Sequence, residues 1–139
     1  MIRNVGSVLI GLLIGGVVFT AFRVVGILLI GLPAGYDAWE ASSNKELVDA
    51  MTPGIWALVF TGYFTGTFAC GYVIGRFAES KTRIFPFMAS LMFMMGWLSI
   101  IVTVPHPLVV SIIGFLIYLP AAFLGHLVGI RSRSKKKSV

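Results

Sequence analysis

The chain has 139 residues, of which 58% are hydrophobic and 12% are charged, and its formal net charge is +6. A soluble domain carries roughly 25% charged residues, so this composition excludes an ordinary water-soluble globule and indicates a membrane protein. The apolar residues form continuous runs instead of alternating with polar ones, which excludes the strands of a membrane β-barrel.

Four of these runs are long enough to cross a bilayer, which needs about 20 apolar residues in a helix. The sequence therefore predicts an all-α membrane protein, a bundle of four transmembrane helices that forms one domain over residues 1–139. The predicted spans cover residues 5–32, 53–75, 84–104 and 108–130, and a basic tail follows at 131–139.

The charged residues between the spans are distributed unequally. The connection after the first span carries four carboxylates and one lysine, whereas both ends of the chain and the second connection are basic. By the positive-inside rule, this asymmetry predicts that both termini are cytoplasmic and that the acidic connection lies outside. The basic residues after the last span are Arg131, Arg133, Lys135, Lys136 and Lys137.

The first run is longer than the 7–15 apolar residues of a typical signal peptide, so it predicts a retained helix. Small residues recur in it at every fourth position, which places them on one face. Small residues at that spacing let two membrane helices approach closely. Ser7, Gly11 and Gly15 are therefore candidate helix-packing residues.

Arg23 is the only charged residue inside a predicted span. At about 1.5 Å per residue it lies roughly 27 Å beyond residue 5, close to the outer interface. One interpretation is an arginine whose guanidinium snorkels to headgroups or water. The alternative is a buried ion pair or a contact to a substrate, with a partner from the outer connection or another chain.

The outer connection contains a helix signal. Ser43 and Glu46 have the spacing of a capping box, in which each side chain bonds to the other residue's backbone. Leu47, Val48 and Met51 follow at positions that give a short helix one apolar face. We expect a short helix on the membrane surface.

The second span carries two pairs of glycines, Gly62 with Gly66 and Gly71 with Gly75. At 100° per residue the two pairs fall on nearly opposite faces. This pattern predicts a helix packed between two neighbours. The last span has a similar face formed by Ala121, Gly125 and Gly129.

Two histidines in or near the last span are candidate functional residues. His106, between two prolines, and His126 lie at opposite ends of that span, so they cannot together bind one haem iron. Each is either a plain interfacial histidine or a functional polar residue. Cys70 is the only cysteine and cannot build a metal site alone, so the sequence predicts no cofactor and no metal.

The last span also carries a resemblance. The motif PHPL at 105–108, the glycine at 114 and LPAAFLG at 119–125 resemble the last span of a widespread bacterial family of small, largely uncharacterised four-helix membrane proteins. This resemblance implies a four-helix fold in the bacterial inner membrane and assigns no function.

The resemblance extends more loosely to PAGYD at 33–37, to the proline and glycine at 53–54 and to GYVIG at 71–75. Members of the family often carry an acidic residue and a Gly-His pair late in the first span. This chain has Arg23 and the pair Gly-Ile at 26–27 instead.

Two classes of function fit these features. The first is a non-catalytic accessory or structural subunit of a larger membrane complex, or a homo-oligomer, because the small-residue faces exceed what four helices are expected to use internally. The alternative is a small carrier or lipid-handling protein without a membrane-embedded carboxylate. The pattern contains no paired catalytic groups, so we expect no enzyme. Anionic lipid headgroups, not nucleic acid, are the expected partners of the basic tail.

Overall fold

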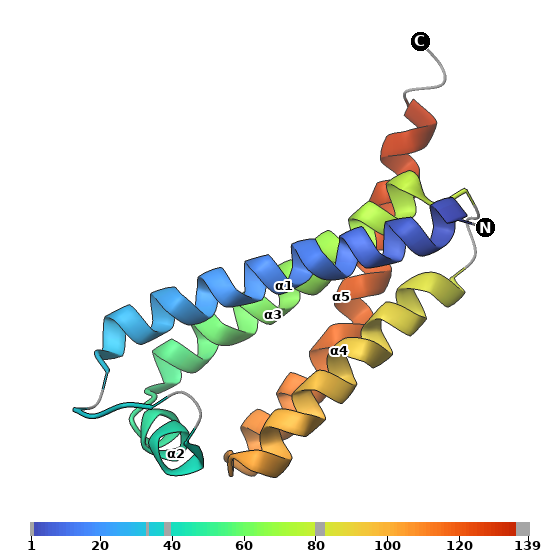
Figure 1. The fold of residues 1–139 in the computed structure, drawn as a ribbon. Helices are drawn as coiled ribbons and strands as arrows, with labels where there is room; N and C mark the ends of the chain where they lie inside the picture. The colour runs from blue at the N-terminus through green and yellow to red at the C-terminus, as the bar shows by residue number, and fades with distance from the viewer. Residues whose placement is uncertain (1, 33, 38–39, 80–82, 136–139) are drawn as a thin grey trace.

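The structure is a computed structural model that describes residues 2–32, 34–37, 40–79 and 83–135, and it is helical throughout this part apart from turns and short connections (Figure 1). Four of its helices are long and apolar enough to cross a membrane, which confirms the predicted all-α membrane bundle. The helices are α1 (Ile2–Ile30), α2 (Ala41–Asp49), α3 (Pro53–Phe77), α4 (Ile84–Thr103) and α5 (Leu108–Lys135).

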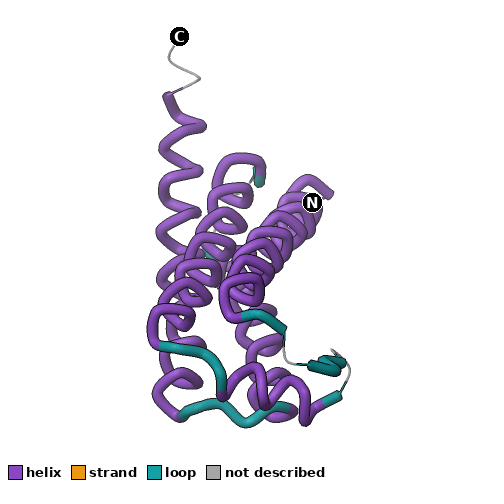
Figure 2. The backbone as a smooth tube through the Cα atoms, turned by 90° about the vertical axis from the view of Figure 1, so that its left-hand side faces the viewer, coloured by secondary structure: helices purple, strands orange, loops and turns teal. Residues whose placement is uncertain are grey.

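Helix α3 is the central element of the bundle. It packs along α1 on one side and along α5 on the other, whereas α4 lies mainly on α5 and touches α1 little (Figure 1). The chain termini lie at one end of the bundle, and the short helix α2 lies at the opposite end (Figure 2). We call the end of the bundle where α1 begins and α5 ends the terminal end, and the opposite end the α2 end.

Glycines on two faces of α3 explain its central position, as the sequence predicted. A β-carbon built on Gly66 would lie 2.8 Å from the carbonyl oxygen of Gly15 on α1. One built on Gly71 would lie 3.0 Å from the Cα atom of Ala122 on α5. Neither distance leaves room for a side chain, so both neighbours approach the α3 backbone directly. Gly62 and Gly66 face α1, whereas Gly71 and Gly75 face α5.

The small residues of α1 and α5 complete the same two interfaces. A β-carbon on Gly11 would lie 3.0 Å from the Sγ atom of Cys70, and one on Gly129 would lie 2.9 Å from the backbone nitrogen of Arg76. Gly125 likewise faces the α3 backbone. The expectation that these faces exceed the internal needs of four helices is wrong, because α3 accepts one neighbour on each of its two glycine faces.

Helix α4 is attached to α5 by a tryptophan. The ring of Trp97 lies against Gly114, where a β-carbon would come within 2.6 Å of it. Its Nε1 atom donates a hydrogen bond to the carbonyl oxygen of Ser111 at 3.1 Å. The first half of α5 therefore holds α4, and its second half, which contains Gly125 and Gly129, holds α3.

The helix bounds differ from the predicted spans by a few residues, and at two helix ends the difference changes the role of individual residues. Helix α5 continues to Lys135, so Arg131 and Arg133 belong to a helix and not to a tail. Lys136 and Lys137 lie outside the described residues. Helix α2 begins at Ala41 after Glu40, which makes no side-chain capping bond. The predicted capping box is wrong because the helix starts two residues before Ser43, which is buried inside it.

Candidate functional site: an aromatic cleft

Two adjoining cavities lie where the α1–α3 pair meets the α4–α5 pair, towards the α2 end of the bundle. We call them the mouth chamber, which α2 borders, and the inner chamber, which lies deeper between the helices. The mouth chamber has a volume of about 80 Å³ and the inner chamber about 230 Å³. Together they form the aromatic cleft, and the residues that line both chambers are Arg23, Tyr63, Trp97 and Ile100.

Helix α2 lines one side of the mouth chamber. Leu47 and Val48 turn inward from this helix and are 3% and 9% exposed. Asn44 is fixed by its neighbours, because its Oδ1 atom accepts a hydrogen bond from the Tyr36 hydroxyl at 3.0 Å and its Nδ2 atom donates to the carbonyl of Glu40 at 3.0 Å. The acidic side chains of α2 do not line the chamber.

His106 lies in the mouth chamber with its ring between two indoles. The ring centroids are 5.7 Å from Trp56 and 5.2 Å from Trp97, and both contacts are edge-to-face. The Nδ1 atom is 2.6 Å from the carbonyl oxygen of Val104, which can only accept, so we assign the hydrogen to Nδ1. A neutral ring then has its acceptor at Nε2. The structure therefore places His106 in the cleft and holds its ring orientation.

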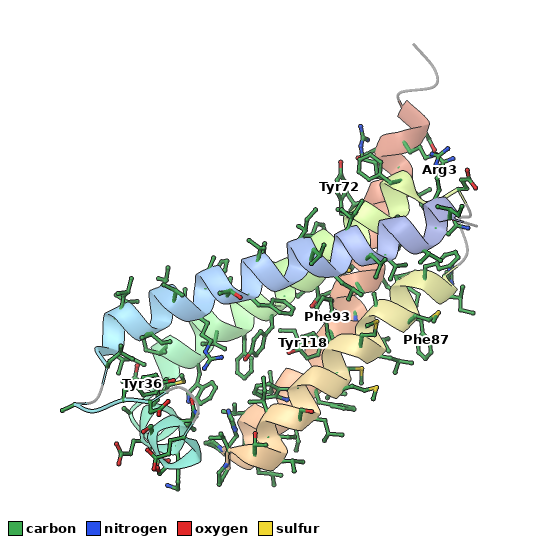
Figure 3. All side chains as sticks on the ribbon, viewed as in Figure 1. Arg3, Tyr36, Tyr72, Phe87, Phe93 and Tyr118 are labelled. Carbon is green, nitrogen blue, oxygen red and sulfur yellow. The ribbon has the colours of Figure 1, made fainter. Side chains whose placement is uncertain are left out.

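The inner chamber is walled by aromatic rings from all four long helices. Phe19 of α1 lies 4.8 Å from Phe93 of α4 between ring centroids, and Tyr63 of α3 lies 5.8 Å from Tyr118 of α5. Phe93 and Tyr118 stack at 6.0 Å between the α1–α3 pair and α4 (Figure 3). Aromatic pairs prefer such edge-to-face and offset arrangements, so packed rings form much of the wall of the inner chamber.

Arg23 occupies the junction of the two chambers. It is exposed, and it makes no hydrogen bond or ion pair to any residue of the described part. Neither chamber has an Asp or Glu among its lining residues. The buried ion pair considered from the sequence is therefore not formed within the described residues, and the cleft contains one arginine without a neutralising carboxylate.

His126 lies in a different part of the molecule from His106. It is 1% exposed and belongs to the α3–α5 interface, where its backbone packs against Gly75. It lines neither chamber of the cleft. The structure therefore does not bring the two histidines together. His126 is a packing residue of the α3–α5 interface at the terminal end.

The basic residues of the terminal end include two that contact other parts of the chain. Arg3 pairs with Glu79 at 3.3 Å, and Arg133 donates a hydrogen bond to the carbonyl oxygen of Ala78 (the position of Arg3 is seen in Figure 3). Arg131 is exposed. Arg133 therefore ties the end of α5 to the end of α3, a role that the sequence analysis did not assign to it.

The aromatic cleft itself was missed by reasoning from the sequence. Its rings come from four separate helices at positions that share no motif, so only the tertiary packing brings them together. Within the described part, no group of three His, Cys, Asp or Glu side chains could hold a metal ion.

Comparison of the chain with protein-family models, with curated proteins and with solved structures finds no match. What the cleft can do therefore follows from its own residues. A mostly apolar pocket with a small number of polar groups is the usual form of a small-molecule site.

Proposed function

We propose that this protein is a non-catalytic membrane protein that binds an amphipathic molecule, taken from the bilayer, in the aromatic cleft. The observation that carries the proposal is that an inner chamber lined mainly by aromatic and apolar side chains adjoins a polar junction at Arg23. A molecule with an apolar chain and a polar end matches both parts. This role corresponds to the lipid-handling class among the functions considered from the sequence.

A lateral route into the cleft supports this proposal. Helices α1 and α4 border the inner chamber and touch each other little. Thr20 of α1 and Met92 of α4 both line the chamber and are exposed, Met92 by 55%. In a bilayer this side faces lipid, so a chain can enter between α1 and α4 without crossing water.

The polar groups of the cleft are suited to recognition. His106 has its Nδ1 hydrogen committed to a backbone carbonyl, and the cleft has no carboxylate or thiol among its lining residues. A nucleophile with an adjacent base is the usual requirement of covalent catalysis. We therefore place binding, and not bond making, at this site.

The charge asymmetry supports an orientation with cytoplasmic termini and α2 outside. The resemblance of the last span supports the bacterial inner membrane. In that orientation the mouth chamber lies near the outer headgroups. The basic terminal end then faces the anionic lipid of the cytoplasmic leaflet.

An accessory role in a larger complex, or self-association, is our second proposal, and a shallow groove on α1 favours it. This groove surrounds Gly16, which has no neighbouring atom within 4 Å. Its other lining residues are Leu12, Leu13, Val17 and Thr20. A helix of another chain could pack there, as small residues allow in membranes.

The binding proposal is tested by filling the inner chamber. Gly96 lines that chamber and has nothing within 4 Å of its missing β-carbon, so Gly96→Leu places a side chain inside it. Gly6→Leu is the matched control, because Gly6 on α1 also has nothing within 4 Å of its missing β-carbon and lines neither chamber. Binding of brominated single-chain amphiphiles is measured by quenching of tryptophan fluorescence in maltoside micelles.

We expect saturable quenching in the unmodified protein and with Gly6→Leu. We expect at least about tenfold weaker binding with Gly96→Leu, because a filled pocket no longer admits the chain. Thermal unfolding of the three proteins checks that each is folded. Equal quenching in all three folded proteins would contradict binding in the cleft. A lower oligomeric mass for Gly16→Leu, in the α1 groove, than for these three proteins would support the second proposal.

A further inference from the structure

We infer that the molecule bound in the aromatic cleft is a single-chain lipid with a small oxyanion headgroup, a carboxylate or a phosphate, held by Arg23 and Tyr63. This inference rests on the proposed function and specifies the chemistry of its ligand. The first observation behind it is the positive charge of the cleft lining. Arg23 lines both chambers, and no carboxylate lines either of them. An anion is the species that complements this arginine.

Tyr63 supplies a second donor at the same place. Like Arg23, it lines both chambers, and its hydroxyl makes no hydrogen bond to any residue of the described part. Its ring is held by edge-to-face contacts with Phe19 at 5.5 Å and Trp97 at 5.4 Å. A guanidinium and a fixed hydroxyl are both suited to an oxyanion, since each donates hydrogen bonds to oxygen.

The shape of the cleft limits the headgroup and the chain. The mouth chamber, at about 80 Å³, is the smaller of the two and is lined on one side by Leu47 and Val48 of α2, so it suits a small headgroup. The inner chamber, at about 230 Å³, continues below Arg23 among aromatic rings and accepts a chain segment. A molecule with a small charged end in the mouth chamber and one chain in the inner chamber satisfies both limits.

Cationic and neutral headgroups match the residues of the cleft less well than an anionic headgroup does. A cationic headgroup would lie beside Arg23 without a carboxylate in the cleft lining, and like charges repel. A neutral headgroup would leave the arginine without a counter-charge. The acidic residues of α2 lie outside the lining of the mouth chamber, so they do not compete for Arg23 there.

The test compares four twelve-carbon probes that differ only in their headgroup: dodecanoate, dodecyl phosphate, dodecanol and dodecyltrimethylammonium. Binding to the full chain in maltoside micelles is followed by tryptophan fluorescence. Arg23→Gln removes the charge, Tyr63→Phe removes the hydroxyl, and Arg131→Gln is the control, an exposed arginine at the terminal end. Circular dichroism and thermal unfolding verify that each variant is folded.

We expect the two anions to bind the unmodified protein about tenfold or more tightly than dodecanol, the factor expected for hydrogen bonds to a charged group. Arg23→Gln should abolish this preference and leave dodecanol binding unchanged. Tyr63→Phe should weaken anion binding by about three- to tenfold. Arg131→Gln should change nothing. The ratio of dodecanoate to dodecyl phosphate affinity then identifies which oxyanion the site prefers.

Each alternative result has a distinct meaning. If dodecanol binds as tightly as the anions, and Gly96→Leu removes binding of both, the cleft binds amphiphiles but the oxyanion inference is overturned. If the anions bind more tightly but Arg131→Gln weakens them as much as Arg23→Gln does, the selectivity is a general surface effect and the assignment to Arg23 is wrong. If none of the four probes binds the folded protein, the proposed function fails as well.

Discussion

The close approach of α3 and α5 makes a quantitative prediction for Gly71. A β-carbon on this residue would lie 2.9 Å from the carbonyl carbon and 3.0 Å from the Cα atom of Ala122. These are backbone atoms, so Gly71→Ala cannot be accommodated by a rotating side chain, and the two helices must separate. Overpacking of this kind costs about 1–3 kcal/mol.

Gly16→Ala is the matched control for Gly71→Ala. Gly16 lies in the middle of α1 and has nothing within 4 Å of its missing β-carbon. Glycine is about 0.8–1.0 kcal/mol less favourable than alanine inside a helix. Gly16→Ala should therefore stabilise the protein slightly, whereas Gly71→Ala gains the same helix propensity and loses more through overpacking. The unfolding free energies of the two variants should differ by about 1–3 kcal/mol.

Titration with sodium dodecyl sulfate in mixed micelles, followed by far-ultraviolet circular dichroism, measures this difference. The midpoint should fall for Gly71→Ala relative to Gly16→Ala, with similar helix content before the transition. Equal midpoints would refute the reasoning, because they would mean that α3 and α5 are not in backbone contact at Gly71.

Two further predictions concern the terminal end and the orientation. Arg133→Met should lower the unfolding free energy by about 0.5–1.5 kcal/mol in the same titration, because it removes the hydrogen bond to the Ala78 carbonyl; the same change at the exposed Arg131 should have little effect, and equal losses would contradict the assignment. A cysteine that replaces Lys45 should react with an impermeant thiol reagent in intact cells, whereas one that replaces Lys81 should not, and the reverse pattern would refute the proposed orientation.

The helical architecture could be predicted because it depends on local signals. Each long helix is a continuous apolar run, and the central place of α3 follows from the angle between its glycine pairs. The period of a sequence identifies which residues share a face, but it does not identify the neighbour of that face. For this reason the sequence identified Gly11, Gly15, Gly125 and Gly129 as helix-packing residues but did not identify α3 as the helix that covers them.

The cleft could not be predicted for a related reason. Tyr63 and Tyr118 are single aromatic residues in long apolar helices, where tyrosine by itself indicates neither lipid nor protein contact. Their proximity depends on how α3 and α5 cross. Arg23 was singled out because a charge in a span is costly, but the direction of its side chain depends on the position of α4 and α2.

The attachment of α4 has a consequence for how the protein is made. During synthesis α1 and α3 are able to pair as soon as α3 reaches the membrane, since their contact between Gly15 and Gly66 needs nothing that comes later. Helix α4 has its main partner in α5, the helix that follows it in the chain. Until α5 follows, Trp97 has neither its hydrogen bond to Ser111 nor the surface of Gly114. The arrival of α5 therefore completes two unfinished interfaces at once, and only then does the inner chamber gain the part of its wall that Tyr118 supplies.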